Sequence, residues 1–481
     1  MGHQGLRRGF FVYGLLCLAW LMLRSGLKPS RAVYPCQAAA RINADLWLAA
    51  YVLPLLQSCP IRARLSGRVP ALLVAAALVA GVGYISLQGG TGIDTLNPSN
   101  RLQLESAEAS VLPASDVYAV TGTDGADDGV ARLLGQMAGN GLKFYNSSRE
   151  TSLGGPVGLI SADDVVIIKV NSQWDQRGGT NTDLVRSIIQ AVVDHPDGFR
   201  GEVVVADNGQ AQYGAQGRGG SLDWASSNAR DHGQSIVDVV NGFKPSFRVS
   251  AYLWDTITTT VVSEFADGDS TDGYVVSTRV ASTSSISAYP KFTTEYGTMV
   301  SFRHGVYVPA DNDYDTGKLK VISVPVLKTH MIYGVTGAVK HYMGVTSDKL
   351  TSSLGYSAHS SVGMGGMGTL MAQTRVPDLN ILDAIYVNSR PEAGPRTTYS
   401  DASEVNVIAA STDPVALDYW AAKHILCAVC EANGWGDASS MDPDNGRSGG
   451  FGYWLRLSME ELNAAGYRFT CDEDRMSVHV N

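Results

Sequence analysis

The chain has 481 residues, a hydrophobic content of 44%, a charged content of 17% and a formal net charge of -9. This composition excludes a mainly disordered chain, and most of the length is too polar for a polytopic membrane protein. At about 150 residues per domain, the length allows up to three domains or one large α/β domain with appendages.

Basic residues are concentrated at the start of the chain. Residues 1–88 hold nine Lys or Arg and a single acid, Asp45, which gives a net charge of +8. The remaining residues hold 28 basic and 45 acidic side chains, a net charge of -17. Because this part of the chain is strongly acidic, it repels the phosphates of nucleic acid, and we expect no nucleic-acid partner.

Residues 1–88 are predicted to form a membrane region. Residues 71–87 carry no charge over seventeen positions, close to the minimum that spans a bilayer, and three arginines at 62–68 precede them. The positive-inside rule then places the later residues outside the cytoplasm. Residues 10–23 form a shorter apolar run, typical of a signal-peptide core or a tilted helix. We therefore expect a membrane-anchored protein whose large extracytoplasmic domain follows a linker at residues 89–115.

From residue 116 the apolar runs alternate between strand and helix patterns. Residues 165–170 (VVIIKV) and 202–206 (EVVVA) are typical of strands buried on both faces of a parallel sheet. Residues 184–193, between them, repeat apolar side chains at helical spacing. Further strands are predicted at 117–120, 319–327, 380–387 and 405–410, and further helices at 224–240 and 415–425. These repeated units predict an α/β fold with a mostly parallel, doubly wound sheet over residues 116–430, followed by a C-terminal extension at 431–481.

Residues 245–310 interrupt this rhythm. They are rich in Ser, Thr, Val and Tyr and poor in helix formers, which predicts β-hairpins inserted into the α/β domain. We expect this β-rich segment to be a satellite that can be shortened without loss of the main sheet.

Polar side chains gather where the predicted strands end, at the edge where open α/β sheets bind ligands. Lysines such as Lys169 and Lys328, next to buried strands, are costly without an anionic partner. That partner is either a carboxylate such as Asp207 or Asp383, or a ligand. The residues predicted to converge on one rim are Lys169, Asn171, Asp207, Lys328, Thr329, His330, Lys340, Asp383 and Asp413.

Within this set Lys328, His330 and Lys340 are the catalytic candidates, and the others are candidates for ligand binding. The lysines would neutralise a phosphate or carboxylate group, and His330 would act as acid or base. A divalent metal held by the aspartates and His330 stays open, with no ligand set assigned. Simpler roles compete, because Asp413 before a proline is typical of a helix N-cap and Asp207-Asn208-Gly209 is typical of a turn.

Cysteines and acidic loops give weaker signals. Cys427 and Cys430, with His424 one helical turn earlier, could contribute to a zinc site, but a fourth ligand is missing. Simple packing, or a disulfide from either cysteine to Cys471, are the alternatives. The aspartates at 311–315 have calcium-loop spacing but lack the Gly and Glu that such loops need, so we interpret them as solvated turns.

Several short motifs, taken together in their order and spacing, resemble the family catalogued as domain of unknown function 362. They are IIKVN (167–171), TDLV (182–185), VADNG (205–209), PVLKTH (325–330), GVTGAVKHYMGV (334–345), ILDAI (381–385) and STDPVALD (411–418). The likeness covers about residues 160–425. Some relatives carry a ferredoxin module, but this chain has no C-x-x-C-x-x-C run, so we expect no iron–sulfur cluster. The resemblance implies no settled activity.

Two functions therefore compete. The first is a membrane-anchored extracytoplasmic enzyme or binding domain for a small anionic molecule. The alternative is a non-catalytic cell-surface interaction protein, suggested by the Ser/Thr-rich residues 245–310. The sequence alone leaves open whether the protein is an enzyme.

Overall fold

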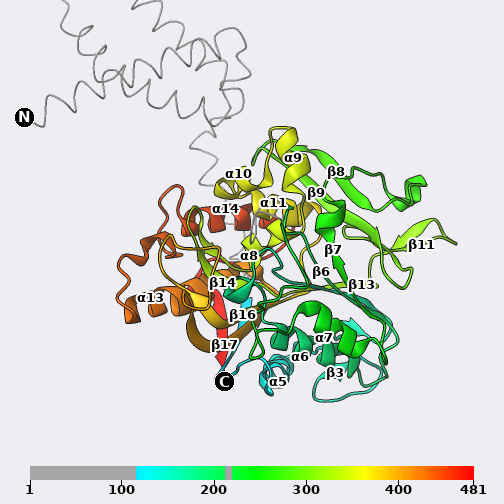
Figure 1. Ribbon diagram of the computed structural model, residues 1–481, viewed down its shortest axis with the longest axis horizontal. Coiled ribbons are helices and arrows are strands. Elements are labelled where there is room, and N and C mark those ends of the chain that lie inside the picture. Colours follow the sequence, from blue (N-terminus) through cyan, green and yellow to red (C-terminus); the bar gives the residue numbers. More distant parts are fainter. Residues whose placement is uncertain (1–114, 212–218) are drawn as a thin grey trace, which may run out of the picture. The chain divides into compact units, whose positions relative to one another are not determined.

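A mostly parallel sheet runs through the centre of the fold (Figure 1). The computed structural model describes residues 115–211 and 219–481, so the predicted membrane region and nearly all of the predicted linker lie outside the described residues. The main path of the sheet is β18-β1-β17-β16-β13-β5-β6-β7. Its strands are β1 (Ser115–Thr121), β5 (Val165–Lys169), β6 (Glu202–Asp207), β7 (Val249–Leu253), β13 (Leu319–Ser323), β16 (Leu379–Asn388), β17 (Ser403–Ser411) and β18 (Met476–Val480).

One strand of this path, β17, runs opposite to the others. Neighbours from β16 to β7 are parallel, and so are β18 and β1, whereas β17 runs antiparallel to both β16 and β1. A short hairpin is attached at the edge of the sheet: β14 (Val326–His330) pairs with the end of β16 and with β15 (Gly334–Thr336).

The sheet is buried on both faces, as its continuous apolar strands predict. In β5, Val165 and Ile167 pack into one hydrophobic cluster, whereas Val166 and Ile168 pack into another. This alternation follows from the two-residue period of a strand. One cluster contains helices α5 (Gly129–Gly139), α6 (Thr182–Val193) and α7 (Ile236–Phe243). The other contains α8 (Ala338–His341), α11 (Gly366–Gln373), α12 (Pro414–Ala421) and α14 (Phe451–Ala464). The predicted α/β class and mostly parallel sheet are thus confirmed.

A second, antiparallel sheet accounts for most of the predicted insertion. It consists of β8 (Gly273–Val280), β9 (Ser285–Thr293), β10 (Met299–Ser301), β11 (Gly305–Val308) and β12 (Asp313–Asp315). The predicted bounds 245–310 are corrected, because β7 belongs to the main sheet. The expectation of a dispensable satellite is corrected too, since Trp254, Phe292 and Phe302 are fully buried in the same cluster as the central strands. Removing them would expose the core.

The remaining elements are short. They are β2 (Tyr145–Asn146), β3 (Gly154–Gly155), β4 (Ile160–Ser161), α9 (Asp348–Ser353), α10 (Ala358–Ser361) and α13 (Ala428–Ala432). A π-helical turn, Ala422–Cys427, joins α12 to α13.

Three predicted boundaries are wrong. The helix predicted at 224–240 begins only at Ile236, where Ser235 and Asp238 form a capping box; the Ser, Asn, Asp and Gly residues before it favour turns. The strand predicted at 319–327 is split into β13 and β14 at Pro325, which has no N–H to donate. The C-terminal residues are no appendage, because β18 pairs with β1.

The predicted membrane spans cannot be compared with the structure. Among the helices of residues 115–211 and 219–481, none is both long and apolar enough to cross a bilayer.

Candidate functional site

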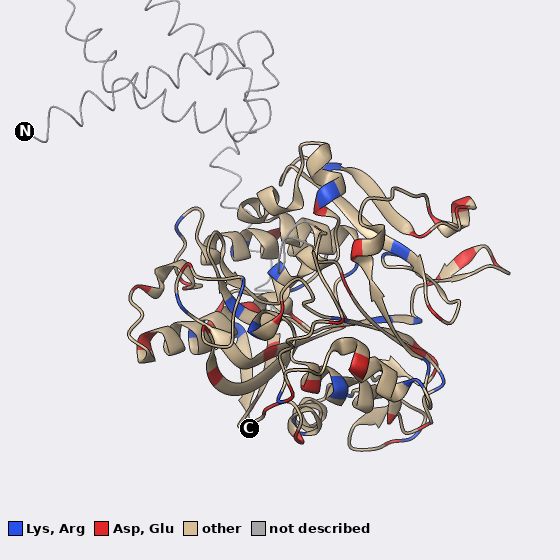
Figure 2. Cartoon of the chain, in the orientation of Figure 1, with Lys and Arg blue, Asp and Glu red and all other residues tan. Residues whose placement is uncertain are grey.

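A cavity lies at the carboxyl ends of β5 and β6, beside β14 and α8. It encloses about 450 Å³ of empty space, including its opening to solvent. Its lining includes Lys169, Asn171, Asp207, Asn208, Gln210, Lys328, Thr336, Lys340, His341, Gly344 and His359. Figure 2 shows Lys and Arg positions in the interior of the fold as well as at its margin. The structure therefore brings all three predicted lysines to one cavity.

Lys169 and Asp207 form a buried ion pair at this edge. They meet because β5 and β6 are parallel neighbours, with Lys169 in register with the residue before Asp207. The Lys169 Nζ lies 2.8 Å from Asp207 Oδ1, while Oδ2 accepts from the backbone N–H and hydroxyl of Ser172 at 2.7 and 2.9 Å. A Cβ at Gly344 would lie 2.1 Å from Asp207 Oδ1, so only glycine fits against this pair. Asp207 is thus the anionic partner of Lys169.

Lys328 has no such partner. Its Nζ donates to the carbonyl oxygen of Gly178 at 2.5 Å, and the residue is only 1% exposed. In the part of the chain that the structure describes, no carboxylate oxygen lies within 4 Å of it. Burial, followed by the nearby Lys340 ammonium, lowers the pKa of Lys328 to about 7. Its charge is therefore poorly compensated within the protein.

Lys340 is in a similar position. Its Nζ lies 5.2 Å from the centre of the Tyr333 ring, a cation–π distance. Burial lowers the pKa of this lysine to about 8, in spite of the raising effect of Asp348. Burial also lowers the pKa of Lys169 to about 8, in spite of the raising effect of Asp207. The cavity thus gathers three buried amines and one closely paired carboxylate.

Two histidines line the cavity, and neither is His330. The Nδ1 of His341 lies 3.0 Å from the side-chain oxygen of Asn171. His359 is backed by Asp348, whose Oδ2 lies 3.3 Å from the ring Nδ1 and whose Oδ1 accepts the backbone N–H of His359 at 2.9 Å. A histidine oriented by a carboxylate in this way is a common arrangement for proton transfer.

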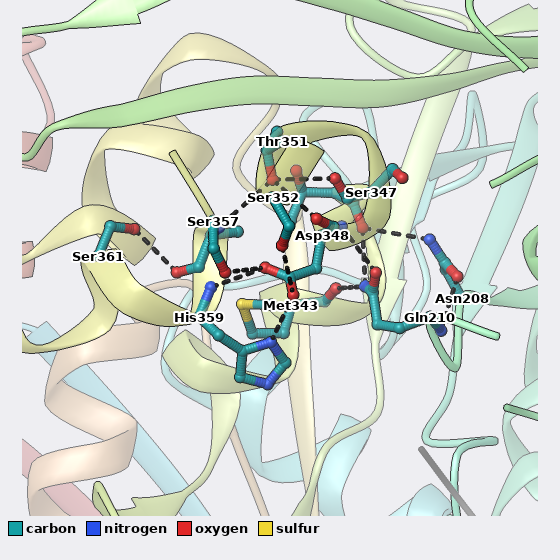
Figure 3. A network of polar contacts seen from close by, with 12 residues as sticks. Asn208, Gln210, Met343, Ser347, Asp348, Thr351, Ser352, Ser357, His359 and Ser361 are labelled. Atoms are coloured by element: carbon teal, nitrogen blue, oxygen red, sulfur yellow. Dashed lines mark hydrogen bonds and ion pairs between the residues drawn. The ribbon is translucent and has the colours of Figure 1, made fainter. Parts of the chain in front are cut away.

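Asp348 is the centre of the polar network that holds this side of the cavity (Figure 3). Its backbone N–H donates to the side-chain oxygen of Gln210 at 2.7 Å, and Gln210 in turn donates to the carbonyl oxygens of Met343 and Thr346. Burial alone would raise the pKa of Asp348, but hydrogen bonds from His359 and Ser357 hold it below its usual range. The residues after β6 thus help to position Asp348 at the start of α9, and through it His359 in α10.

His330 and Thr329 serve the β14–β15 hairpin instead. The Nδ1 of His330 accepts from the backbone N–H groups of Ile332 and Tyr333 at 3.1 and 3.3 Å. Burial, followed by Lys340, lowers the pKa of His330 to about 2. The Thr329 hydroxyl donates to the carbonyl oxygen of Gly334 at 3.3 Å. Neither residue is among those that line the cavity.

The two remaining predicted aspartates also lie away from the cavity. Asp383 sits within β16 and accepts from the backbone N–H groups of Asn181 and Ile385. Asp413 caps α12 through the N–H groups of Val415 and Ala416. Because β17 is antiparallel, its carboxyl end lies at the opposite edge of the sheet. The N-cap interpretation of Asp413 therefore holds.

The comparison with protein families agrees with the motifs. Residues 319–423 match the family described as domain of unknown function 362. The resemblance to this family is confirmed. This matching segment includes β14 and α8, and it therefore contains Lys328, Lys340 and His341. Neither a curated protein nor a solved structure matches the chain.

The weaker sequence signals yield no metal site in the described ranges. Across residues 115–211 and 219–481, no group of three or more His, Cys, Asp or Glu side chains is arranged to hold a metal ion. Cys427, Cys430 and Cys471 are free thiols, and burial raises the pKa of Cys427 to about 12. Asp313 and Asp315 are exposed as expected, but they lie on strand β12 rather than in a turn.

Sequence reasoning missed His359, Gln210 and Gly344. His359 lies in a run of short helices without a periodic pattern, and nothing in the sequence places it near β5. Gln210 directly follows the Asp207-Asn208-Gly209 turn, so its position was a usable signal. The glycine is required by a contact that only the folded chain makes.

Proposed function

We propose that the protein binds a small anionic ligand in this cavity through Lys169, Lys328 and Lys340. One observation carries the proposal: three buried amines face one cavity that supplies a single carboxylate, and that carboxylate is already paired. A buried charge without a compensating partner destabilises the fold. Proteins retain such charges at functional sites, where a bound ligand compensates them. A phosphate or carboxylate group would supply the missing negative charge.

The size of the cavity favours a small anionic group. The space open to the centres of water molecules is about 40 Å³. One water needs roughly 10–15 Å³ by this measure, so the space suits a few waters or one tetrahedral or planar oxyanion. A larger ligand would place its anionic group here and extend toward solvent.

Acid–base chemistry on the bound ligand is the second part of the proposal. His359, with Asp348 behind its ring, would give or take a proton from a ligand held by the lysines. This role replaces the one predicted for His330, whose Nδ1 is already occupied by two backbone N–H groups.

Removing either of the two amines that have no ion-paired carboxylate should weaken anion binding. We expect Lys328→Met and Lys340→Met each to weaken binding of inorganic phosphate or acetate at least about tenfold, since a charged hydrogen bond to the anion is lost. Isothermal titration calorimetry on the full chain measures this directly. Lys318→Met is the matched control, because Lys318 is a partly exposed surface lysine 3.5 Å from Asp163. Absence of binding to the unaltered chain, or an equal loss in Lys318→Met, would contradict the proposal.

We also propose that residues 1–88 anchor the protein in a membrane with the α/β domain outside the cytoplasm. The support is the uncharged run at 71–87 after three arginines. Protease added outside intact cells should then digest residues beyond about 90. Protection of the domain until the cells are lysed would contradict this topology.

A further inference from the structure

Besides the indole N–H of Trp174, two polar side-chain atoms of the cavity lining have no hydrogen-bond partner among the described residues. They are the Nε2 of His341 and the hydroxyl of Thr336. Both residues line the cavity and are buried, at 2% and 6% exposure. Buried polar atoms normally form hydrogen bonds, so we expect a ligand or a water molecule to bond to these two atoms.

The surroundings of His341 determine which of its ring nitrogens carries the proton. The side-chain oxygen of Asn171 accepts the backbone N–H of Val326 at 2.9 Å, which fixes this oxygen as an acceptor. The Nδ1 of His341, 3.0 Å from the same oxygen, must therefore be the N–H donor. Burial, together with Lys169 and Lys328, holds the pKa of His341 well below its usual range, so the ring is neutral. Its Nε2 then presents a lone pair.

This lone pair differs in kind from the other groups that face the ligand. The amines of Lys328 and Lys340 donate when charged, and the Thr336 hydroxyl can rotate to donate or accept. His341 Nε2 can only accept. A fully deprotonated oxyanion would place an oxygen lone pair against it, whereas an oxyanion with an O–H would donate to it.

We infer that the cavity selects a tetrahedral oxyanion that still carries a proton, such as hydrogen phosphate, over one that carries none, such as sulfate. The inference rests on the proposed anion-binding function and names its ligand class. Near pH 8 hydrogen phosphate and sulfate have the same charge and nearly the same shape, so the O–H is the property that separates them. Selection by a buried acceptor of this kind is strong, because the alternative leaves the acceptor unpaired.

Titration calorimetry on the full chain at pH 8, with inorganic phosphate, arsenate and sulfate as separate probes, tests this selection. Phosphate and arsenate should bind alike, since both carry an O–H. Sulfate should bind at least about tenfold more weakly. In His341→Gln the amide can turn its NH₂ toward the anion, so the preference for phosphate should largely disappear.

His330→Gln is the matched control. His330 is also a buried histidine of the same family segment, but it does not line the cavity, so this variant should keep the preference for phosphate. Equal binding of sulfate and phosphate by the unaltered chain would overturn the inference while leaving the anion site standing, and this outcome needs no variant to fold. Full preference retained in His341→Gln would also overturn it. Failure of all three anions to bind would remove the proposed function itself.

Discussion

Lys169→Met is expected to destabilise the ligand-free protein by about 3–5 kcal/mol, whereas Lys328→Met should change its stability by no more than about 1 kcal/mol or raise it. The two lysines are equally buried, but only Lys169 has a carboxylate partner. Without Lys169 the Asp207 carboxylate remains buried next to an apolar side chain. Without Lys328 the bond to the Gly178 carbonyl and the more distant attraction to Asp207 and Asp383 are lost, but repulsion from Lys340 and Lys169 is relieved.

Urea denaturation of both variants, followed by circular dichroism after dialysis into an anion-poor buffer, measures this contrast. Lys318→Met again serves as the control, and its free energy of unfolding should stay within about 0.5 kcal/mol of the unaltered chain. A fall of several kcal/mol in Lys328→Met would assign that lysine a structural role. An unchanged stability in Lys169→Met would show that its ion pair with Asp207 contributes little.

The pairing of Lys169 with Asp207 could be predicted because it depends on local rules alone. Both residues end continuous apolar strands, and the carboxyl ends of neighbouring parallel strands meet at one edge. Lys328 and Lys340 were reached by the same reasoning, although Lys328 lies in a separate hairpin strand rather than after a long one. The position of a lysine at or near the end of a predicted strand was therefore enough to predict that the three lysines lie near one another.

The failures share one cause, which is that strand direction and loop packing are set by contacts between distant residues. Asp413 follows a strand that resembles the others in sequence, but that strand runs antiparallel and ends at the other edge. His330 is only two residues after Lys328 in the chain, yet its ring turns back onto its own hairpin. His359 reaches the cavity through Asp348 and Gln210, a network that no sequence period reveals.

Phosphate binding should weaken steeply as the pH rises from about 7.5 to about 9.5, by up to about tenfold per pH unit for each lysine that must take up a proton. Burial lowers the pKa of Lys328 to about 7 and that of Lys169 and Lys340 to about 8, so part of the cavity is uncharged in this window. A bound anion favours the charged amines and raises their pKa. Binding is therefore coupled to proton uptake, which calorimetry in buffers of different ionisation enthalpy would measure.

The stability of the ligand-free protein should move in the opposite direction. A lysine whose pKa is about 7 when folded, against 10.5 for the free side chain, binds fewer protons in the folded state than in the unfolded state between these values. Above about pH 10.5 this lysine is neutral in both states and does not destabilise the fold. As the pH falls toward 7 the unfolded state takes up the proton more readily, so the free energy of unfolding falls. Lys328→Arg keeps its charge at every pH in this range. It should therefore reduce the pH dependence of both phosphate affinity and the free energy of unfolding by the equivalent of about one proton. Lys318→Met should follow the unaltered chain. An affinity for phosphate that does not change between pH 7.5 and 9.5 would mean that the three amines are charged before the anion arrives, and the buried lysines would then need a compensating charge from elsewhere in the chain.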